Sequence, residues 1–259
     1  MKSLVKSLVN QLGFEIRKKA ASDSTEKQLP VQNLFPSDFE REEIELFNLV
    51  SPYTMTSKER VFSLIQAVKY ISRHKIPGDV VECGVWKGGS MMAIAKTLLA
   101  EQDSSRDLYL FDTFSGMSEP SKEDLDFSGQ EAAKLLDSSS KEDGWVWCNA
   151  PMEGVQNVMS KTGYNWDKIH FIQGKVEDTL PTNALKEIAL LRLDTDWYES
   201  TRHELIHLFP LLSKDGVIII DDYGYWQGAK KAVDEYFDEH NIKILLNRID
   251  ETGRIAIKS

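Results

Sequence analysis

One short run of apolar residues restricts the fold of this chain more than any other feature of its sequence. The run Gly-Val-Ile-Ile-Ile occupies residues 216–220 and ends directly before Asp221 and Asp222. Consecutive β-branched residues are typical of a strand buried on both faces, as in a parallel sheet covered by helices. Two adjacent carboxylates at the end of such a strand resist joint ionisation, since each raises the pKa of the other. We therefore expect a buried central strand with a cation near its carboxyl end.

The remaining pattern predicts an α/β fold, because strands and helices alternate along the chain. Predicted strands cover 79–83, 108–111, 169–173, 189–193 and 217–220, and a final antiparallel pair covers 243–247 and 254–257, joined by a turn at 250–253. Predicted helices cover 39–50, 56–74, 90–101, 155–161, 184–186, 200–212 and 226–239, the second of them capped by Thr56. This order predicts a mostly parallel sheet with helices on both faces and a C-terminal antiparallel strand.

Length and composition limit the class of protein. A chain of 259 residues suits one α/β domain with additions. The net charge of −10 argues against nucleic-acid binding, which needs a basic surface. Cys83 and Cys148 provide neither a disulfide framework nor metal-ligand spacing, and they favour a cytoplasmic location. No apolar stretch approaches the roughly 20 residues that span a bilayer.

Two segments lie outside the regular alternation. Residues 1–20 place apolar side chains at helical spacing among Lys and Arg, which predicts a basic amphipathic helix, followed by a polar linker to residue 33. This helix could lie on an anionic membrane surface, or pack on its own domain or on a second subunit. The main domain then covers 34–259. Within it, the polar stretch 115–151 follows the second strand and predicts a lid over the carboxyl edge of the sheet.

A glycine-rich turn follows the first strand and begins a helix. The segment 80–90 reads Val-Val-Glu-Cys-Gly-Val-Trp-Lys-Gly-Gly-Ser. Glycines let the backbone approach a ligand, and the first amides of a helix favour anionic or polar groups. The spacing matches neither the dinucleotide-binding nor the phosphate-loop pattern, which argues against NAD and ATP.

Asp112 at the end of the second strand strengthens the case for a nucleoside cofactor. An acidic residue at this position can accept hydrogen bonds from both ribose hydroxyls of an adenosine. The alternative is an aspartate that caps a turn. Gln173 and Gly174, after the third strand, would flank the adenine ring.

Four aspartates converge on one edge of the predicted sheet. Asp194 and Asp196 follow one strand, Asp221 and Asp222 follow the next, and the carboxyl ends of parallel strands meet at one edge. Carboxylates without His or Cys select a hard cation such as Mg²⁺ or Ca²⁺. The alternative is that these aspartates cap the helices that follow them.

Several strings resemble the macrocin-type sugar O-methyltransferases, in the order found in that family. The strings occupy residues 77–90, 110–114, 193–201 and 220–224, and Tyr-Thr-Met-Thr-Ser at 53–57 is similar to the family's segment before the first core helix. The resemblance covers roughly residues 53–257. It implies a Rossmann-like class I methyltransferase fold, S-adenosyl-L-methionine and Mg²⁺ as cofactors, and a sugar-containing acceptor.

The resemblance also assigns roles to individual residues. It implies Asp196 as the general base and Asp194, Asp221 and Asp222 as metal ligands. The cofactor-binding set that it implies is Tyr53, Met55, Glu82, Gly84, Gly88, Ser90, Asp112, Thr113, Gln173 and Gly174. The predicted N-terminal helix suits a peripheral enzyme at the inner face of the membrane, acting on a lipid-linked or surface glycan.

Two other functions are compatible with these residues. A catechol-type O-methyltransferase would use the same metal geometry on an aromatic diol. A non-catalytic protein that binds cofactor or glycan would not need four clustered carboxylates. We expect the protein to form a homo-oligomer.

Overall fold

The computed structural model describes residues 35–140 and 145–259, and one compact unit spans Phe39–Ser259. The amphipathic helix and linker predicted over residues 1–33 lie outside the described residues. Their membrane or subunit contact therefore stays a prediction, as does the homo-oligomer. Within the described ranges, no helix is both long enough and apolar enough to cross a bilayer.

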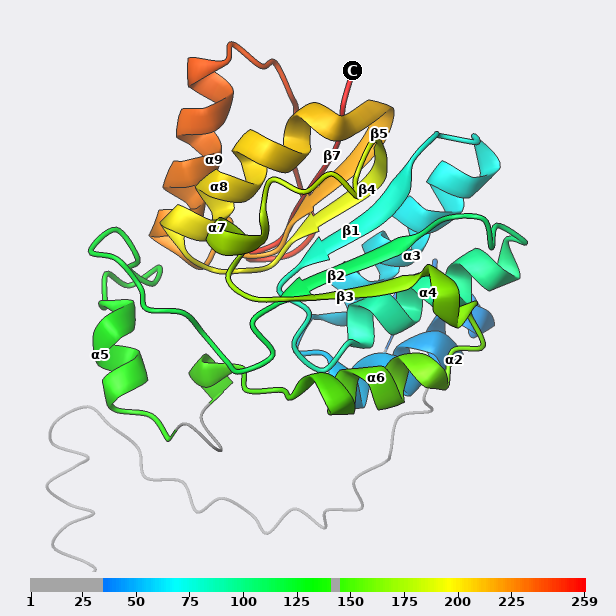
Figure 1. Ribbon diagram of the computed structural model, residues 1–259, viewed down its shortest axis with the longest axis horizontal. Helices are drawn as coiled ribbons and strands as arrows, with labels where there is room; N and C mark the ends of the chain where they lie inside the picture. Colours follow the sequence, from blue (N-terminus) through cyan, green and yellow to red (C-terminus); the bar gives the residue numbers. More distant parts are fainter. Residues whose placement is uncertain (1–34, 141–144) are drawn as a thin grey trace, which may run out of the picture. The chain divides into compact units, whose positions relative to one another are not determined.

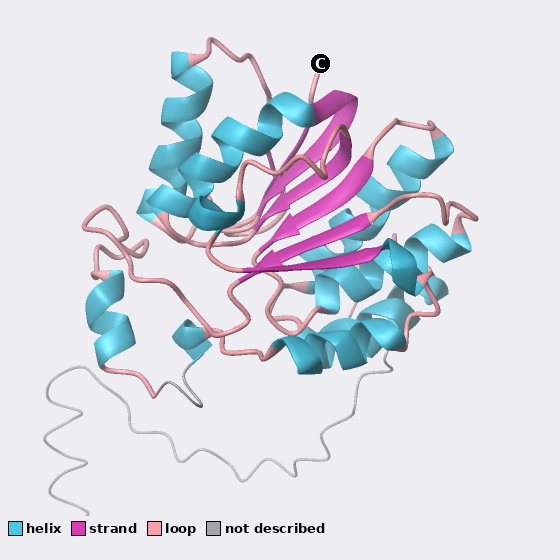
Figure 2. Ribbon diagram, viewed as in Figure 1, coloured by secondary structure: helices cyan, strands magenta, loops and turns pink. Residues whose placement is uncertain are grey.

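The described residues form a seven-stranded, mostly parallel sheet (Figures 1 and 2). Its strands are β1 (Asp79–Cys83), β2 (Leu108–Asp112), β3 (Ile169–Gln173), β4 (Ile188–Leu193), β5 (Leu212–Ile220), β6 (Asn247–Arg248) and β7 (Arg254–Ile257). The order across the sheet is β3-β2-β1-β4-β5-β7-β6. Strands β1 to β5 are parallel, and β7 is antiparallel to both β5 and β6. The predicted fold class is confirmed.

Helices cover both faces of the sheet. Their bounds are α2 (Arg41–Val50), α3 (Lys58–Arg73), α4 (Gly89–Ala100), α5 (Ala132–Asp137), α6 (Met152–Ser160), α7 (Val176–Thr179), α8 (Tyr198–Leu208) and α9 (Gln227–Glu239). Helices α2, α3, α4 and α6 share one apolar core, and α7, α8 and α9 share the other. Figure 2 shows these two groups on opposite sides of the strands.

The inner strand β5 shows why the sheet needs both layers. Val217 and Ile219 pack into the core under α3 and α4, whereas Ile218 and Ile220 pack into the core under α8 and α9. Successive side chains of a strand point to opposite faces, so an unbroken apolar run must be covered twice.

Several predicted boundaries were wrong: the strand predicted from 217 begins at Leu212, and the helix predicted to reach 212 ends at Leu208. Three further errors concern whole elements or caps. The predicted helix at 184–186 is absent, and the helix after β3 is α7 instead, with Val176 buried. The strand predicted at 243–247 shrinks to β6, because only Asn247 and Arg248 pair with β7. Ile242, Ile244 and Leu246 before β6 alternate as in a strand. They pack against the core on the α9 side of the sheet, but they do not pair with a neighbouring strand.

The third error concerns the start of α3, which is capped by Ser57 rather than Thr56. The Ser57 hydroxyl accepts the Arg60 N–H at 3.1 Å, and the Thr56 hydroxyl instead bonds with the Thr54 hydroxyl at 2.9 Å. The N-cap is the residue whose backbone is still extended directly before the first helical residue, and in α3 that residue is Ser57.

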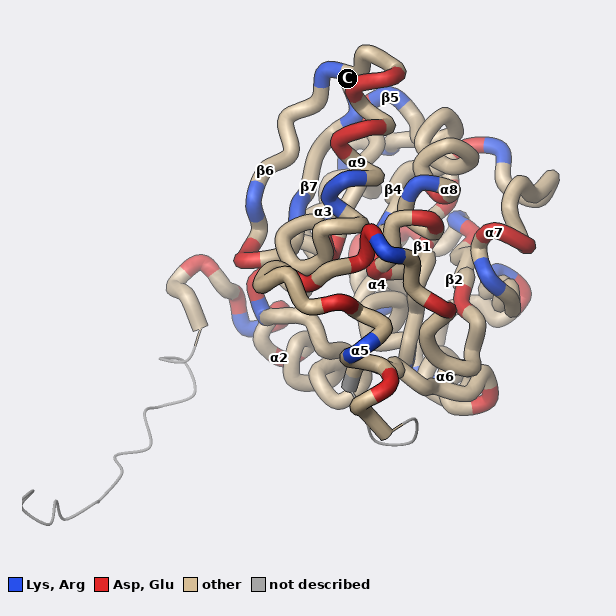
Figure 3. The backbone as a smooth tube through the Cα atoms, turned by 90° about the vertical axis from the view of Figure 1, so that its left-hand side faces the viewer, with Lys and Arg blue, Asp and Glu red and all other residues tan. Residues whose placement is uncertain are grey.

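The sheet order places a ligand crevice between β1 and β4. The chain continues from β1 to β2 on one side, and β4 lies on the other side, so the strand order reverses there. Open α/β sheets bind ligands at the carboxyl ends of the strands at this switch point. The described parts of the insertion, residues 115–140 with α5 and residues 145–151, lie beyond the arrowheads of the strands (Figure 1). Figure 3 shows Lys and Arg interspersed with Asp and Glu along one side of the described chain.

Candidate active site

A cavity of about 320 Å³ opens at the carboxyl ends of the strands. Its wall combines the segment before α3, the turn after β1, the ends of β2, β4 and β5, and the insertion. The lining includes Tyr53, Met55, Arg60, Gly84, Trp86, Ser90, Asp112, Thr113, Met117, Ser118, Val146, Cys148, Gly174, Arg192, Asp194, Asp196, Asp221, Asp222, Tyr225 and Trp226. Most of the predicted site residues therefore share one chamber.

Asp112 holds the glycine turn against β2. One carboxylate oxygen, Oδ2, accepts the N–H groups of Val85 at 2.7 Å and Trp86 at 2.9 Å. The other, Oδ1, accepts the Phe114 N–H at 2.7 Å. Burial raises the pKa of Asp112, although these N–H groups partly offset that effect. The aspartate thus shapes the turn, and its contact with a ribose stays a prediction.

The glycines of this turn are required by contacts within the chain. Gly84 has a φ of +82°, and a Cβ there would collide with the Asp194 carbonyl at the end of β4. Gly88 has a φ of +85°, and a Cβ there would lie 3.0 Å from the Val155 side chain. That these glycines admit a ligand stays a prediction. Gly84 lines the cavity, and it also lets β1 and β4 meet at the switch point.

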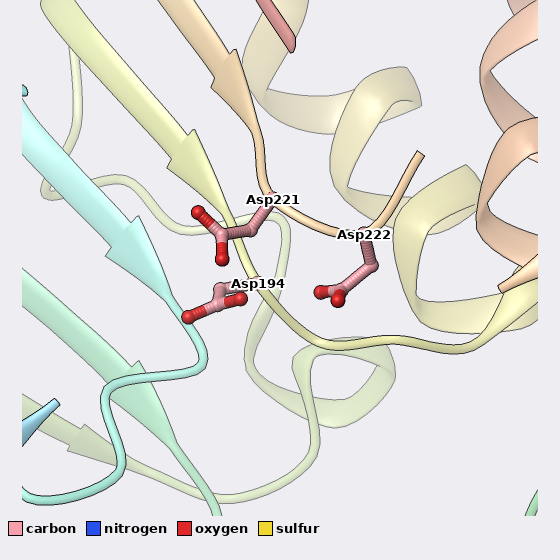
Figure 4. A group of neighbouring side chains, drawn as sticks. All are labelled: Asp194, Asp221 and Asp222. Carbon is pink, nitrogen blue, oxygen red and sulfur yellow. The ribbon is translucent and has the colours of Figure 1, made fainter. Parts of the chain in front are cut away.

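Three carboxylates gather at the ends of β4 and β5. Figure 4 shows the side chains of Asp194, Asp221 and Asp222 pointing toward one another. One oxygen from each lies within 4.8 Å of the others. The two strands are in register here, since the Asp221 N–H donates to the Leu193 carbonyl at 2.9 Å.

Two arginines supply part of the positive charge that the sequence predicts near these aspartates. Arg192, with a side chain only 3% exposed, contacts Glu82 at 2.5 Å, Asp221 at 2.7 Å and Asp194 at 2.8 Å. Arg60, in the first turn of α3, contacts Asp221, and its Nε lies 2.9 Å from Asp250. No motif in the sequence marks either arginine as a site residue. Arg192 could have been found from the sequence, because it is the one charged residue in the apolar strand at 189–193 and a buried charge needs a partner of opposite charge.

Asp196 lies beside Asp222 and lines the cavity. Burial raises the pKa of Asp196 to about 7, although a hydrogen bond with Asp222 acts in the opposite direction. Burial and the nearby Asp196 charge raise the pKa of Asp222 well above its usual range. The backbone φ of Asp196 is +71°, a left-handed conformation that costs energy and is often found at functional sites.

Three predicted cofactor residues do not reach the cavity wall. Glu82 is fully buried beneath it and pairs with Arg192. Gly88 caps α4, and the Gln173 amide donates to the Thr113 carbonyl at 3.4 Å. Sequence analysis also missed the residues that the insertion contributes to the wall, because no motif marks them: Met117, Ser118, Val146 and Cys148.

Comparison with known proteins connects this geometry to a family. The model of the macrocin O-methyltransferase (TylF) family matches residues 4–257. The chain is 33% identical over 201 residues to the 8-demethyl-8-(2,3-dimethoxy-α-L-rhamnosyl)-tetracenomycin-C 4′-O-methyltransferase of Streptomyces olivaceus, covering 78% of this chain and 74% of that protein. It is 31% identical over 201 residues to the mycinamicin III 3″-O-methyltransferase of Micromonospora griseorubida, covering 78% and 76%.

Solved structures agree with the sequence comparisons. The O-methyltransferase NovP superposes with a TM-score of 0.70 at 30% identity, covering 80% of this chain and 82% of that chain. A calicheamicin methyltransferase superposes with a TM-score of 0.62 at 18% identity, covering 95% of each chain, which supports the fold. The cavity, the glycine turn and these relatives lead to one conclusion: the chain belongs to the macrocin O-methyltransferase family and is an S-adenosylmethionine-dependent O-methyltransferase.

Proposed function

We propose that this enzyme methylates a hydroxyl group of a sugar, with a divalent cation held at the ends of β4 and β5. One observation carries the proposal: Asp194, Asp196, Asp221 and Asp222 line the same cavity as the glycine turn. A methyl donor at the turn and an acceptor at the aspartates would share one chamber. Holding two reactants in one orientation supplies much of the rate enhancement of such a transfer.

The three clustered carboxylates fit a hard cation. Their oxygens are mutually close, and Oδ2 of Asp222 is buried with no hydrogen-bond partner among the described residues. Carboxylate ligands without His or Cys select Mg²⁺ or Ca²⁺. When bound, such a cation would lower the pKa of an acceptor hydroxyl. Asp194, Asp221 and Asp222 would hold it, while Arg192 and Arg60 orient the first two of these carboxylates.

Asp196 is the proposed general base. Its position in the cavity wall, beside the carboxylates that would hold the cation, suits a group that accepts the proton of an acceptor hydroxyl. Asp196 accepts the proton of the acceptor hydroxyl as that oxygen becomes methylated. The chain otherwise contributes orientation and exclusion of water.

A sugar acceptor is favoured over an aromatic diol by the relatives, one of which is named for a rhamnosyl group. Met117, Val146, Tyr225 and Trp226 line the cavity and belong to one apolar cluster, and such a wall suits the apolar face of a sugar ring. Comparing methyl transfer to methyl α-L-rhamnopyranoside and to catechol tests this choice. Faster methylation of catechol would favour the aromatic diol.

The variant Asp196→Asn tests the base. We expect turnover to fall by about 10²- to 10⁴-fold, because the amide cannot accept the proton. Affinity for S-adenosylhomocysteine, measured by calorimetry, should stay unchanged. Asp215→Asn makes the same change at an exposed position of β5 and is the matched control. Full activity of Asp196→Asn would remove Asp196 from this role, and absence of S-adenosylhomocysteine binding by the wild type would contradict the cofactor site.

A further inference from the structure

Helices α8 and α9 both begin at the active-site edge, and neither is capped by its own N-cap side chain. Their N-cap residues are Trp197 and Trp226, and neither side chain accepts a hydrogen bond from its helix. The first N–H groups of a helix have no partner within the helix, so other groups must satisfy them. Each of these helices follows a pair of the proposed catalytic aspartates within a few residues.

A three-residue stretch of the insertion, Asp124 to Asp126, supplies the missing partners. The Asp124 carboxylate Oδ1 accepts the Tyr198 N–H at 2.7 Å, in the first turn of α8. The Leu125 carbonyl accepts the Gln227 N–H at 2.8 Å, in the first turn of α9. The Gln227 side-chain amide donates to the Asp126 carbonyl, also at 2.8 Å. The stretch therefore joins two helix starts that are about 30 residues apart.

The environment of Asp124 fits this role closely. The residue is 1% exposed, and its second oxygen, Oδ2, accepts the Ser121 N–H at 2.7 Å and the Ser121 hydroxyl at 2.9 Å. A Cβ at Gly228 would collide with Oδ1, so glycine at that position lets the carboxylate reach between the two helix starts. A negative charge at a helix N-terminus is favoured by the helix dipole.

The same contacts determine where the proposed base lies. Asp196 is two residues before Tyr198, and its backbone is left-handed. The Trp197 N–H donates to the Thr195 carbonyl at 2.8 Å, and its indole N–H donates to the Ser118 carbonyl at 3.0 Å. The insertion therefore holds the end of the short loop that carries Asp196, through the Trp197 indole and the Tyr198 N–H.

We propose that Asp124 is a positioning residue for methyl transfer, and that residues 118–126 of the insertion act as a fixed clamp on the loops that carry Asp196 and Asp222. The proposal rests on the roles assigned above to these two aspartates. It differs from the lid expected from the sequence, because the clamp holds the helix starts with buried hydrogen bonds.

The test compares Asp124→Ala and Asp124→Asn with Glu123→Gln, which changes the neighbouring acid in its partly exposed ion pair with Lys231. Hydrogen exchange is measured on the amides of residues 195–199 and 224–228. We expect Asp124→Ala to accelerate exchange at least tenfold there, and Asp124→Asn to restore part of the protection because its amide oxygen still accepts the Tyr198 N–H. Unchanged exchange in Asp124→Ala would overturn the clamp.

Ligand affinities separate positioning from general destabilisation. In Asp124→Ala the dissociation constant for Mn²⁺, followed by electron paramagnetic resonance, should rise at least tenfold, whereas that for S-adenosylhomocysteine should change less than twofold. Equal weakening of both ligands would indicate a merely structural role and overturn the proposal. If the wild type binds no Mn²⁺, the proposed metal site fails, and the exchange measurement alone then decides the clamp.

Discussion

At the scale of single residues, the active-site edge contains more carboxyl groups than its two arginines can neutralise. Arg192 and Arg60 contact Glu82, Asp194, Asp221 and Asp250. Glu204 on α8 is a further fully buried acid behind this edge. Burial raises its pKa well above the usual range, and the nearby charges of Glu177 and Asp194 raise it further. A carboxyl group with its pKa raised in this way binds its proton more tightly in the folded protein than in the unfolded chain.

Glu204→Gln should therefore stabilise the protein increasingly as the pH rises. A carboxyl whose pKa is raised on folding binds its proton more tightly in the folded state, so stability falls as the pH rises above the unfolded value of about 4.3. The slope for one such group approaches about 1.4 kcal/mol per pH unit. Glutamine lacks this titration. Urea unfolding of both proteins at pH 5, 6 and 7 checks the difference, and a difference independent of pH would contradict it.

At the scale of elements, the turn between β1 and α4 depends on contacts with distant parts of the chain. Its shape comes from Asp112 on β2, and its glycine requirement comes from Asp194 on β4. The sequence marks this turn as a cofactor site because glycine is frequent in such sites. It cannot reveal that Gly84 is needed for the approach of two neighbouring strands.

Gly84→Ala should destabilise the domain by at least about 3 kcal/mol, since a left-handed backbone and a collision with β4 add together. Gly154→Ala is the matched control, because a Cβ at this position of α6 meets nothing within 4 Å. It should leave stability unchanged or raise it by about 0.5–1 kcal/mol, as alanine does in helices. Chemical denaturation measures both, and equal stability of the two variants would refute the strand-approach argument.

At the scale of the whole molecule, the cavity joins segments from the region before α3 to the end of β5. A ligand that fills it binds only the folded chain and must stabilise all of these segments together. S-adenosylhomocysteine at a hundred times its dissociation constant should add about 2.7 kcal/mol. For a domain of this size that corresponds to roughly 5–10 °C in Tm.

Differential scanning calorimetry with and without S-adenosylhomocysteine checks this shift. Asp112→Ala should bind the ligand at least tenfold more weakly and lose most of the shift, because two N–H groups of the turn and the Phe114 N–H after β2 lose their acceptor. An undiminished shift in that variant would show that Asp112 does not shape the cofactor site.

The sequence alone determined the α/β class, the positions of the five parallel strands and the edge at which the four aspartates meet. These follow from local periodicity and from the rule that parallel strands end together, so they need no knowledge of distant contacts. Motif resemblance added the family. The apolar run before Asp221 was the strongest of these signals, since it is covered on both faces as expected.

Only the tertiary structure decided how the charges at that edge are balanced and what the insertion does. Arg60, Arg192 and Asp124 lie far in sequence from some of the groups that they contact, and no spacing rule connects them. Their roles depend on burial: a charge or a helix N–H removed from water needs a partner, and folding determines which group is within reach. The aspartate pair after β5 is therefore readable from the sequence, whereas its arginine partners are visible only in the folded chain.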